Sequence, residues 1–427
     1  MKDQTNRRSI GKTALALLAG GAAMILPGAA QATDGYFLNG IGAKSKGMGG
    51  VAIALPQDAL SIASNPAAAT EVGHRMDIGV DVFIPKRGAS IEGNAFGLDG
   101  DYSGNDANPF LLPEVGYVRP LSDRVSVGIA IYGNGGMNTT YGKANPFGAL
   151  GAQGTAGVDL KQGFITPTVA VKVTPDHSLG VSPVVVVQSF KARGIQPFAG
   201  AAADPANFTN RGTSWSAGGG VRVGYYGKLS DQISIGATYQ TMLWTGKFQK
   251  YAGLFADSGS FDVPSQYGAG ITFRPNKRLT LSADIKQIEY SDVESVGNPV
   301  QILFTGVPFG ADEGPGFGWN DVTVVKFGAA YAASDAWTVR AGYGRNDNPV
   351  PQSQTLLNVL APGIVQDHFT AGATWTSRSG LEVTGYVMHA PKNEVFGQAS
   401  IPPNFGGGEA NVRLSETSFG LAAGISF

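Results

Sequence analysis

The stretch VGYVRPLSDRVSVGIAIY, residues 115–132, contains the pattern from which the fold of this chain is predicted. Two runs, Val115–Leu121 and Arg124–Tyr132, are separated only by the turn residues Ser122 and Asp123. In the second run, four branched apolar residues share one face: Val125, Val127, Ile129 and Ile131. Alternation with a period of two indicates β-strands that have one apolar face.

The same arrangement of strand, short polar turn, strand and long loop recurs six times along the chain. The other five units are Phe164–Val173 with Leu179–Phe190, Trp215–Leu229 with Ile233–Trp244, Gln266–Phe273 with Leu279–Tyr290, Val322–Tyr331 with Trp337–Tyr343, and Phe369–Trp375 with Leu381–His389. One strand before the series, Asp77–Ile84, and one after it, Thr417–Phe427, bring the total to about 14, and closed bacterial barrels have an even number.

Loop lengths distinguish an outer-membrane barrel from a soluble sandwich, because both folds show this alternation. The turns inside the units are tight, whereas the connections between units run to roughly 20 to 30 residues. A barrel also has lipid on one side of its wall and a polar lumen on the other. In Leu279–Lys286, every second residue is polar: Thr280, Ser282, Asp284 and Lys286. The sequence therefore predicts an all-β fold, a transmembrane antiparallel β-barrel.

Composition excludes several classes of protein. The 427 residues include no cysteine, so the chain has no disulfide scaffold, thiolate metal site or cysteine nucleophile. The net charge is −1 with dispersed Lys and Arg, which argues against nucleic acid as a partner. After Leu26, no apolar stretch approaches the ~18 residues that a membrane helix needs. We expect no bound cofactor or metal.

The first 75 residues divide into two segments. A cationic start, an apolar run from Ala14 to Leu26 and small residues ending at Ala32 are typical of a secretory signal peptide, cleaved after Ala32. Residues 33–75 are rich in Gly and Ala and lack sustained alternation. Because wall side chains cannot fill so wide a lumen, we expect this segment to plug it. The predicted division is a signal peptide at 1–32, a hatch at 33–75 and a transmembrane barrel at 76–427.

Four blocks of the sequence resemble the FadL family of outer-membrane transporters. The run from Gly35 to Ala67 resembles the hatch of that family and ends in its Asn-Pro-Ala motif at Asn65, Pro66 and Ala67. The other blocks are Glu114–Gly142, Gly157–Val173 and the closing strand FGLAAGISF, residues 419–427. The terminal Phe427 resembles the signal for barrel assembly. The resemblance spans nearly the whole chain that follows the signal peptide.

The resemblance implies a monomeric 14-stranded barrel that takes up long-chain fatty acids or aromatic hydrocarbons. In the family, a kink in the third strand opens the wall so that ligand leaves sideways into the membrane. That position corresponds here to Asn134, Gly135 and Gly136, although the same residues could simply begin an extracellular loop. Likewise, Asn65 and Pro66 could hold the hatch in its resting position or form only a turn.

Two long loops carry large apolar residues among small and polar ones. In Lys191–Ser214 and Lys247–Ser265 these residues are Phe198, Phe208, Leu254, Phe255 and Phe261. If they are exposed at the loop tips, they are suited to capturing a hydrophobic ligand. The alternative is that they pack against one another and cap the barrel mouth.

The predicted function is passive transport of hydrophobic molecules through the outer membrane, with hatch movement and lateral exit. The alternatives are an outer-membrane lipid-modifying enzyme and a general porin. The expected partners are a hydrophobic small molecule, outer-membrane lipid, lipopolysaccharide and the barrel-assembly machinery. Asp99, Asp101 and Ser103 match half of a calcium loop, but position 12 of that loop is Phe110, so we expect a solvated loop. The four histidines give no positive sign of catalysis.

Overall fold

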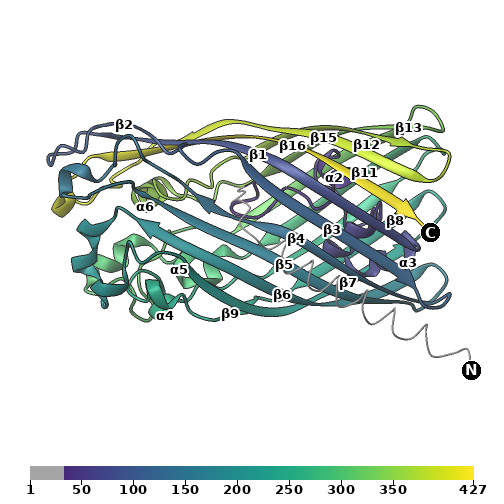
Figure 1. The fold of residues 1–427 in the computed structure, drawn as a ribbon, viewed down its shortest axis with the longest axis horizontal. Coiled ribbons are helices and arrows are strands. Elements are labelled where there is room, and N and C mark those ends of the chain that lie inside the picture. Colours follow the sequence, from purple (N-terminus) through teal and green to yellow (C-terminus); the bar gives the residue numbers. More distant parts are fainter. Residues whose placement is uncertain (1–32) are drawn as a thin grey trace, which may run out of the picture.

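The computed structural model describes residues 33–427, which form a barrel closed by fourteen long antiparallel strands (Figure 1). Each strand pairs with its neighbours along the chain, and the first pairs with the last, from Arg75 opposite Ser426 to Glu92 opposite Glu409. The predicted signal peptide, residues 1–32, lies outside the described residues. The predicted fold class is confirmed.

The fourteen barrel strands are β1 (Arg75–Glu92), β3 (Phe110–Pro120), β4 (Val125–Asn138), β5 (Gly157–Lys172), β6 (His177–Arg193), β7 (Ser214–Lys228), β8 (Ile233–Gln240), β10 (Gln266–Phe273), β11 (Leu279–Ile288), β12 (Val322–Ala332), β13 (Trp337–Asn346), β14 (Asp367–Thr376), β15 (Leu381–Val395) and β16 (Glu409–Ser426). Two short strands add to this wall: β2 (Gly100–Ser103) pairs with β1, and β9 (Trp244–Thr245) pairs with β7. Every predicted strand is present.

Several strands extend farther than alternation predicts. β1 continues past Ile84 to Glu92, and β16 begins at Glu409 instead of Thr417. The two extensions pair with each other residue by residue. Backbone hydrogen bonds do not depend on side-chain polarity, so pairing continues beyond the part of the strand in which apolar and polar residues alternate.

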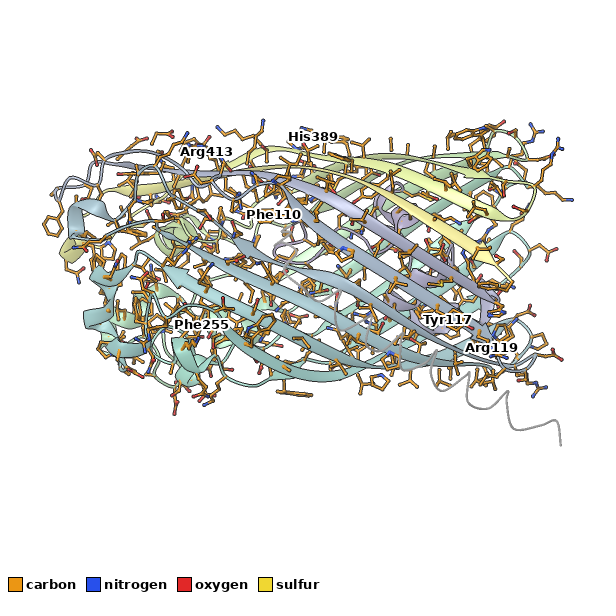
Figure 2. All side chains as sticks on the ribbon, viewed as in Figure 1. Phe110, Tyr117, Arg119, Phe255, His389 and Arg413 are labelled. Atoms are coloured by element: carbon orange, nitrogen blue, oxygen red, sulfur yellow. The ribbon has the colours of Figure 1, made fainter. Side chains whose placement is uncertain are left out.

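Side chains alternate between the two surfaces of the wall (Figure 2). On β11, Leu281 and Ile285 face outward and are exposed, whereas Ser282 and Asp284 face the lumen and are buried. The outward residues would contact lipid, and the inward ones contact the chain inside the barrel. The predicted apolar exterior and polar lumen are therefore confirmed.

The two ends of the barrel differ (Figure 1). Tight turns close one end, while long loops with short helices cover the other. The α-helices are α2 (Ala43–Lys46), α3 (Ala69–Val72), α4 (Ala256–Gly259), α5 (Glu294–Gly297) and α6 (Thr355–Asn358). The 3-10 helices are η1 (Ala59–Ala63), η2 (Pro66–Ala68), η3 (Gly148–Leu150), η4 (Gln196–Ala201), η5 (Pro205–Asn207), η6 (Gln249–Tyr251), η7 (Tyr290–Asp292), η8 (Val300–Thr305), η9 (Gln352–Gln354) and η10 (Pro403–Phe405). None of the helices within residues 33–427 combines the length and the hydrophobicity of a membrane span.

The last residue completes the outward apolar face of β16. Phe419, Leu421 and Phe427 are exposed on this face, and the backbone N–H of Phe427 donates to the His74 carbonyl at 2.9 Å. We predict that deleting Phe427 lowers the amount of folded barrel in the outer membrane, because the closing strand loses its terminal aromatic residue. Heat-modifiable gel mobility of membrane fractions measures this amount. Undiminished folded protein would contradict the assembly role.

Candidate functional site

Residues 33–74 run inside the barrel, and most of them are buried (Figure 1). Their backbone lies so close to the wall that several wall glycines leave no room for a Cβ atom. A Cβ at any of these glycines would collide with the segment: Gly116, Gly180, Gly224, Gly236, Gly328 and Gly342. These close approaches account for part of the high glycine content.

Charged groups on the wall hold α2 in place. The Lys46 ammonium pairs with Asp81 on β1 and, at 2.7 Å, with Glu114 on β3. Burial opposes the charge on Lys46, but the two carboxylates outweigh it and raise the pKa of Lys46 well above its ordinary value. Lys44 pairs with Glu382 on β15 at 2.6 Å. The segment is therefore bound by ion pairs as well as by close packing.

A second ionic cluster lies at the start of the segment. The Asp34 carboxylate binds the ammonium groups of Lys326 at 2.8 Å and of Lys286 at 3.0 Å. Burial of Asp34 disfavours its charged form, but the two lysines outweigh that effect and lower the pKa of Asp34 to about 2. Asp34 is therefore ionised at neutral pH and links the segment to β11 and β12.

Asn65 connects three parts of the molecule and is fully buried. Its Nδ2 group donates to the carbonyl of Ile53 within the segment and to that of Tyr225 on β7, each at 2.8 Å. Its Oδ1 atom accepts from the Ala67 N–H at 3.0 Å and so caps η2, in which Pro66 is the first residue. The motif is a turn, and its asparagine also attaches the segment to the wall.

We predict that Gly224→Ala displaces this turn, because the added Cβ collides with Asn65 Oδ1. Overpacking of this kind costs about 1–3 kcal/mol, so the variant should expose the segment to limited proteolysis at lower protease concentration than the wild type. Gly385→Ala on β15 is the control, since its Cβ would meet only ordinary contacts at 3.4 Å or more. Equal proteolysis of both variants would contradict the close fit at Gly224.

The wall is interrupted between β3 and β4. The two strands pair from Glu114 opposite Tyr132 to Pro120 opposite Ser126. Beyond that point, within the described chain, residues 110–113 of β3 pair with β1, whereas residues 133–138 of β4 pair with β5 and, at Gly135, with Phe37 of the interior segment. The register of β4 and β5 shifts between Gly133 and Gly135, which leaves Asn134 as the extra residue. Asn134, Gly135 and Gly136 therefore lie within β4 and do not begin a loop.

The interior segment docks on this irregular part of β4. The Leu38 N–H donates to the Asn134 carbonyl at 3.1 Å, and the Gly136 N–H donates to the Tyr36 carbonyl at 3.0 Å. The interruption itself is covered by a side chain, since Leu112 of β3 lies over Gly133. Leu112 belongs to a small apolar cluster with Leu38 and Phe83. Residues from the segment thus help to close the interrupted wall.

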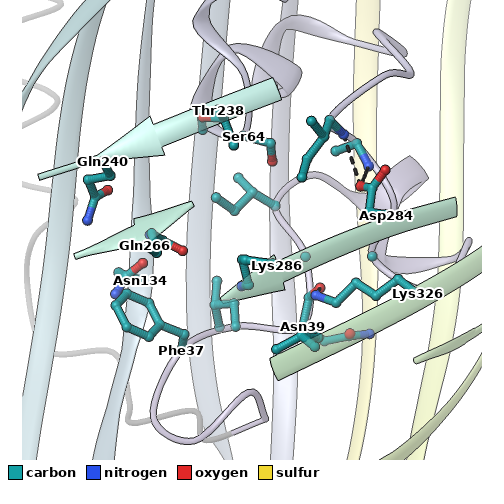
Figure 3. A pocket seen from close by; sticks show the side chains of 18 of the residues that line it. Phe37, Asn39, Ser64, Asn134, Thr238, Gln240, Gln266, Asp284, Lys286 and Lys326 are labelled. Atoms are coloured by element: carbon teal, nitrogen blue, oxygen red, sulfur yellow. Dashed lines mark hydrogen bonds between the residues drawn. The ribbon is translucent and has the colours of Figure 1, made fainter. Parts of the chain in front are cut away.

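A cavity with about 700 Å³ of empty space, part of which is open to solvent, lies between the segment and the wall (Figure 3). Its apolar lining includes Phe37, Ile53 and Val324. Its wall side is charged, because Arg222, Lys286 and Lys326 face it together with Asp284, whose Oδ2 atom accepts from the Ala52 and Ile53 N–H groups. The inward faces of the strands therefore contribute cations to a cavity that also has an apolar lining.

The predicted loop residues form a packed group at the mouth. Phe198, Phe208, Phe255 and Phe261 are buried and Leu254 is partly buried, which agrees with the alternative that these residues pack against one another. Phe255 lies 4.9 Å from Phe261 between ring centroids. The residues still surround a hollow of about 510 Å³, to which all but Phe261 contribute. Figure 2 shows Phe255 at the long-loop end of the barrel.

Comparison with known proteins identifies the family. Residues 24–417 match the model of the outer membrane protein transport proteins OMPP1, FadL and TodX. The chain belongs to this family. The family consists of transporters located in the outer membrane, so the predicted relationship and location are confirmed.

Solved structures of FadL/TodX family members share the fold at low sequence identity. The toluene transporter TodX of Pseudomonas putida has a TM-score of 0.67 at 18% identity, covering 91% of this chain and 99% of that one. A Pseudomonas aeruginosa FadL homologue gives 0.68 at 16%, covering 92% and 99%. The toluene transporter TbuX of Ralstonia pickettii gives 0.62 at 18%, covering 91% and 99%. No curated protein matches the chain.

The possible calcium ligands and the histidines of this FadL/TodX family member do not come together in one site. Asp99 accepts from the Gly93 and Asn94 N–H groups, and Asp101 pairs with Arg413. These two carboxylates are therefore used in contacts within the loop and with the wall. The four histidines lie on different parts of the barrel: His74 and His177 bond to tyrosines, His389 lies beside Thr417, and His368 is buried in β14.

Asp34, Arg222 and Lys326 belong to the site but were not predicted from the sequence. Alternation could have indicated that Arg222 and Lys326 face the lumen, because each occupies an inward-facing position of its strand. Asp34 had no such signal, since it precedes the wall and contacts β11 and β12 only through the tertiary fold.

Proposed function

We propose that this protein passively transports hydrophobic molecules inward across the outer membrane and releases them through the interrupted wall. The observation that carries the proposal is the position of the cavity beside that interruption. Asn134, the extra residue of β4, also lines the cavity. Leu38 lines the cavity and packs in one cluster with Leu112, which covers Gly133. Movement of Leu38 would therefore open a path from the cavity to lipid.

We propose that residues 33–74 are the hatch and that its first residues form the moving part. Tyr36 and Leu38 are bonded to β4 by two backbone hydrogen bonds, and Asp34 is bound by two lysines. Asn65, Pro66 and Ala67 are farther along the segment and hold it at β7. A ligand that displaces residues 36–38 would uncover the interruption between β3 and β4 while the rest of the hatch stays in place.

The hollow in the mouth supports a role in ligand capture. It is bordered by the long loops and lined mainly by apolar groups, including Phe198, Phe208 and Phe255. A hydrophobic molecule that enters this hollow leaves water before it reaches the cavity. Packed loops and a capture site are compatible here, because the packed side chains themselves enclose the hollow.

The charge of the cavity favours a ligand with an acidic head group. Three cations, Arg222, Lys286 and Lys326, face two carboxylates, Asp34 and Asp284, which leaves one positive charge in excess. A long-chain fatty acid fits both this charge and the apolar lining. An aromatic hydrocarbon fits only the lining, although two similar proteins are described as toluene transporters.

Reconstituted vesicles test this function. Uptake of oleate should saturate, while sucrose should neither enter nor be accompanied by an ionic conductance. A steady conductance with sucrose entry would instead identify a general porin, and hydrolysis of vesicle lipids would identify a lipid-modifying enzyme. Lipopolysaccharide and the barrel-assembly machinery remain the proposed partners in the cell, and the protein is proposed to act as a monomer.

A further inference from the structure

A second pocket lies on the lumen side of the wall, beside the interruption. It has about 300 Å³ of empty space, part of which is open to solvent, and it is separate from the cavity described above. β1 contributes Phe83 and Arg87, β4 contributes Gly136 to Asn138, and β16 contributes Leu414 and Glu416. Residues 361–363, from the loop after α6, complete its lining. The pocket thus joins the irregular part of β4 to the seam of the barrel.

Glu416 is an unusual residue in this pocket. Its side chain is fully buried, and neither carboxylate oxygen has a hydrogen-bond partner within the described chain. Burying a charged or polar group without a partner is costly. The residues opposite Glu416 on the neighbouring strands, Pro85 on β1 and Ala390 on β15, have apolar side chains that cannot donate a hydrogen bond.

Arg87 lines the same pocket but does not neutralise Glu416 directly. Its Nη1 atom donates to the carbonyl of Asn138 at 2.9 Å and to its side chain at 2.7 Å, and its Nη2 atom donates to the Ala107 carbonyl at 2.8 Å. These bonds fix the guanidinium, and no ion pair with Glu416 forms in the described chain. The buried Nε atom of Arg87 has no partner either. The pocket therefore contains a donor and an acceptor that do not bind each other.

We propose that this pocket binds the neutral hydroxyl group of an otherwise apolar molecule, as in an alcohol or a phenol. The hydroxyl would donate to the Glu416 carboxylate, and its oxygen can accept from a donor such as Arg87 Nε. Phe83, Met137 and Leu414 would contact the apolar part. An ionised head group would have to leave water to enter this buried pocket, which is costly. A pure hydrocarbon would leave the carboxylate without a partner.

This inference deepens the proposed function, since a pocket beside the interrupted wall would select among molecules about to leave. It rests on the proposed function for its role in transport, but binding can be measured without transport. The chemistry predicts that hydroxylated hydrocarbons are favoured ligands in addition to the molecules that occupy the cationic cavity.

The test compares p-cresol with p-xylene, which differ by a hydroxyl in place of a methyl group. Equilibrium dialysis against the full protein in lipid nanodiscs, corrected with empty nanodiscs, gives both affinities. The wild type should bind p-cresol about tenfold more tightly, the effect of one hydrogen bond to a buried group that otherwise has no partner. Glu416→Leu should bring the ratio close to one. Glu394→Leu on β15 is the matched control, because Glu394 pairs with Lys392 outside the pocket, and it should keep the ratio.

A second variant keeps the proposal testable if Glu416→Leu fails to fold. Met137→Trp keeps Glu416 and fills the apolar side of the pocket, so it should weaken binding of p-cresol while oleate uptake continues. Equal affinities in the wild type, a ratio that survives in the folded Glu416→Leu variant, or an unchanged p-cresol affinity in the Met137→Trp variant would overturn the proposal. If the wild type does not take up oleate, the proposed transport function is refuted. The ratio of the p-cresol and p-xylene affinities would then still stand as a separate result.

Discussion

A disulfide between Leu112→Cys and Gly133→Cys is expected to abolish uptake of hydrophobic molecules, and a reducing agent should restore it. A Cβ built on Gly133 lies 4.0 Å from the Cβ of Leu112, within the range of about 3.5–4.5 Å that disulfides require. The bond would join β3 to β4 in the interval where their backbones are unpaired. If ligand leaves through this interval, uptake should fall at least about tenfold, which corresponds to a barrier raised by about 1.4 kcal/mol.

The chain itself provides a clean background for this experiment, because it contains no cysteine. The matched control joins the same two strands where their pairing is intact, with Val115→Cys and Ile131→Cys, which are opposite in register. That disulfide should leave uptake unchanged. Uptake of oleate in oxidised and reduced vesicles is the measurement. Full uptake by the oxidised Leu112→Cys, Gly133→Cys protein would show that ligand leaves by another route.

Asn65→Ala is expected to change uptake by about tenfold while leaving the barrel folded. The substitution removes the donor to the Ile53 and Tyr225 carbonyls and the acceptor for the Ala67 N–H. Each buried group left unpaired costs about 1–3 kcal/mol. A closed ladder of fourteen strands should withstand this loss, whereas 1.4 kcal/mol already shifts an equilibrium about tenfold. The predicted result is altered oleate uptake at equal surface levels.

Asn145→Ala provides a closely matched control for Asn65→Ala. Asn145 also donates to two carbonyls, those of Gly154 and Gly194, and accepts from the N–H two residues later, at Phe147. It lies in an outer loop and does not contact the interior segment. Both variants therefore lose the same kinds of bonds, but only Asn65→Ala should alter uptake. Identical uptake by Asn65→Ala and the wild type would show that the motif is only a structural turn.

The fold was predictable because the patterns that indicate it involve residues that are close together in the sequence. Alternation in runs such as Arg124–Tyr132 and the difference between short and long connections required no knowledge of distant contacts. Strand ends were less predictable, since the pairing of Lys86–Glu92 with Glu409–Ser415 depends on the partner strand and not on hydrophobicity. The interruption at Gly133 was indicated by its neighbouring glycines, but glycine also marks loops, so the sequence left both alternatives open.

The site was less predictable because it is assembled from distant residues. Asp34 and Lys326 are bonded across 292 positions of sequence, and Leu38 meets Asn134 only because the segment folds back inside the barrel. The sequence showed which aromatic residues the loops carry, but their burial depends on how loops from separate hairpins pack together. Glu416 shows the limit most clearly, since nothing in its neighbours in sequence indicates that it lacks a partner.

The glycines of the wall restrict how the interior segment can move. Gly116, Gly180 and Gly224 receive the segment on β3, β6 and β7, and further glycines receive it on β8, β12 and β13. The segment therefore fits against glycine positions on strands all around the barrel. As a rigid body, it can neither rotate about the barrel axis nor slide along it without steric collision. Under the proposed function, gating is then a local hinge-like displacement near the first residues of the segment, a motion small enough to reset after every molecule that passes.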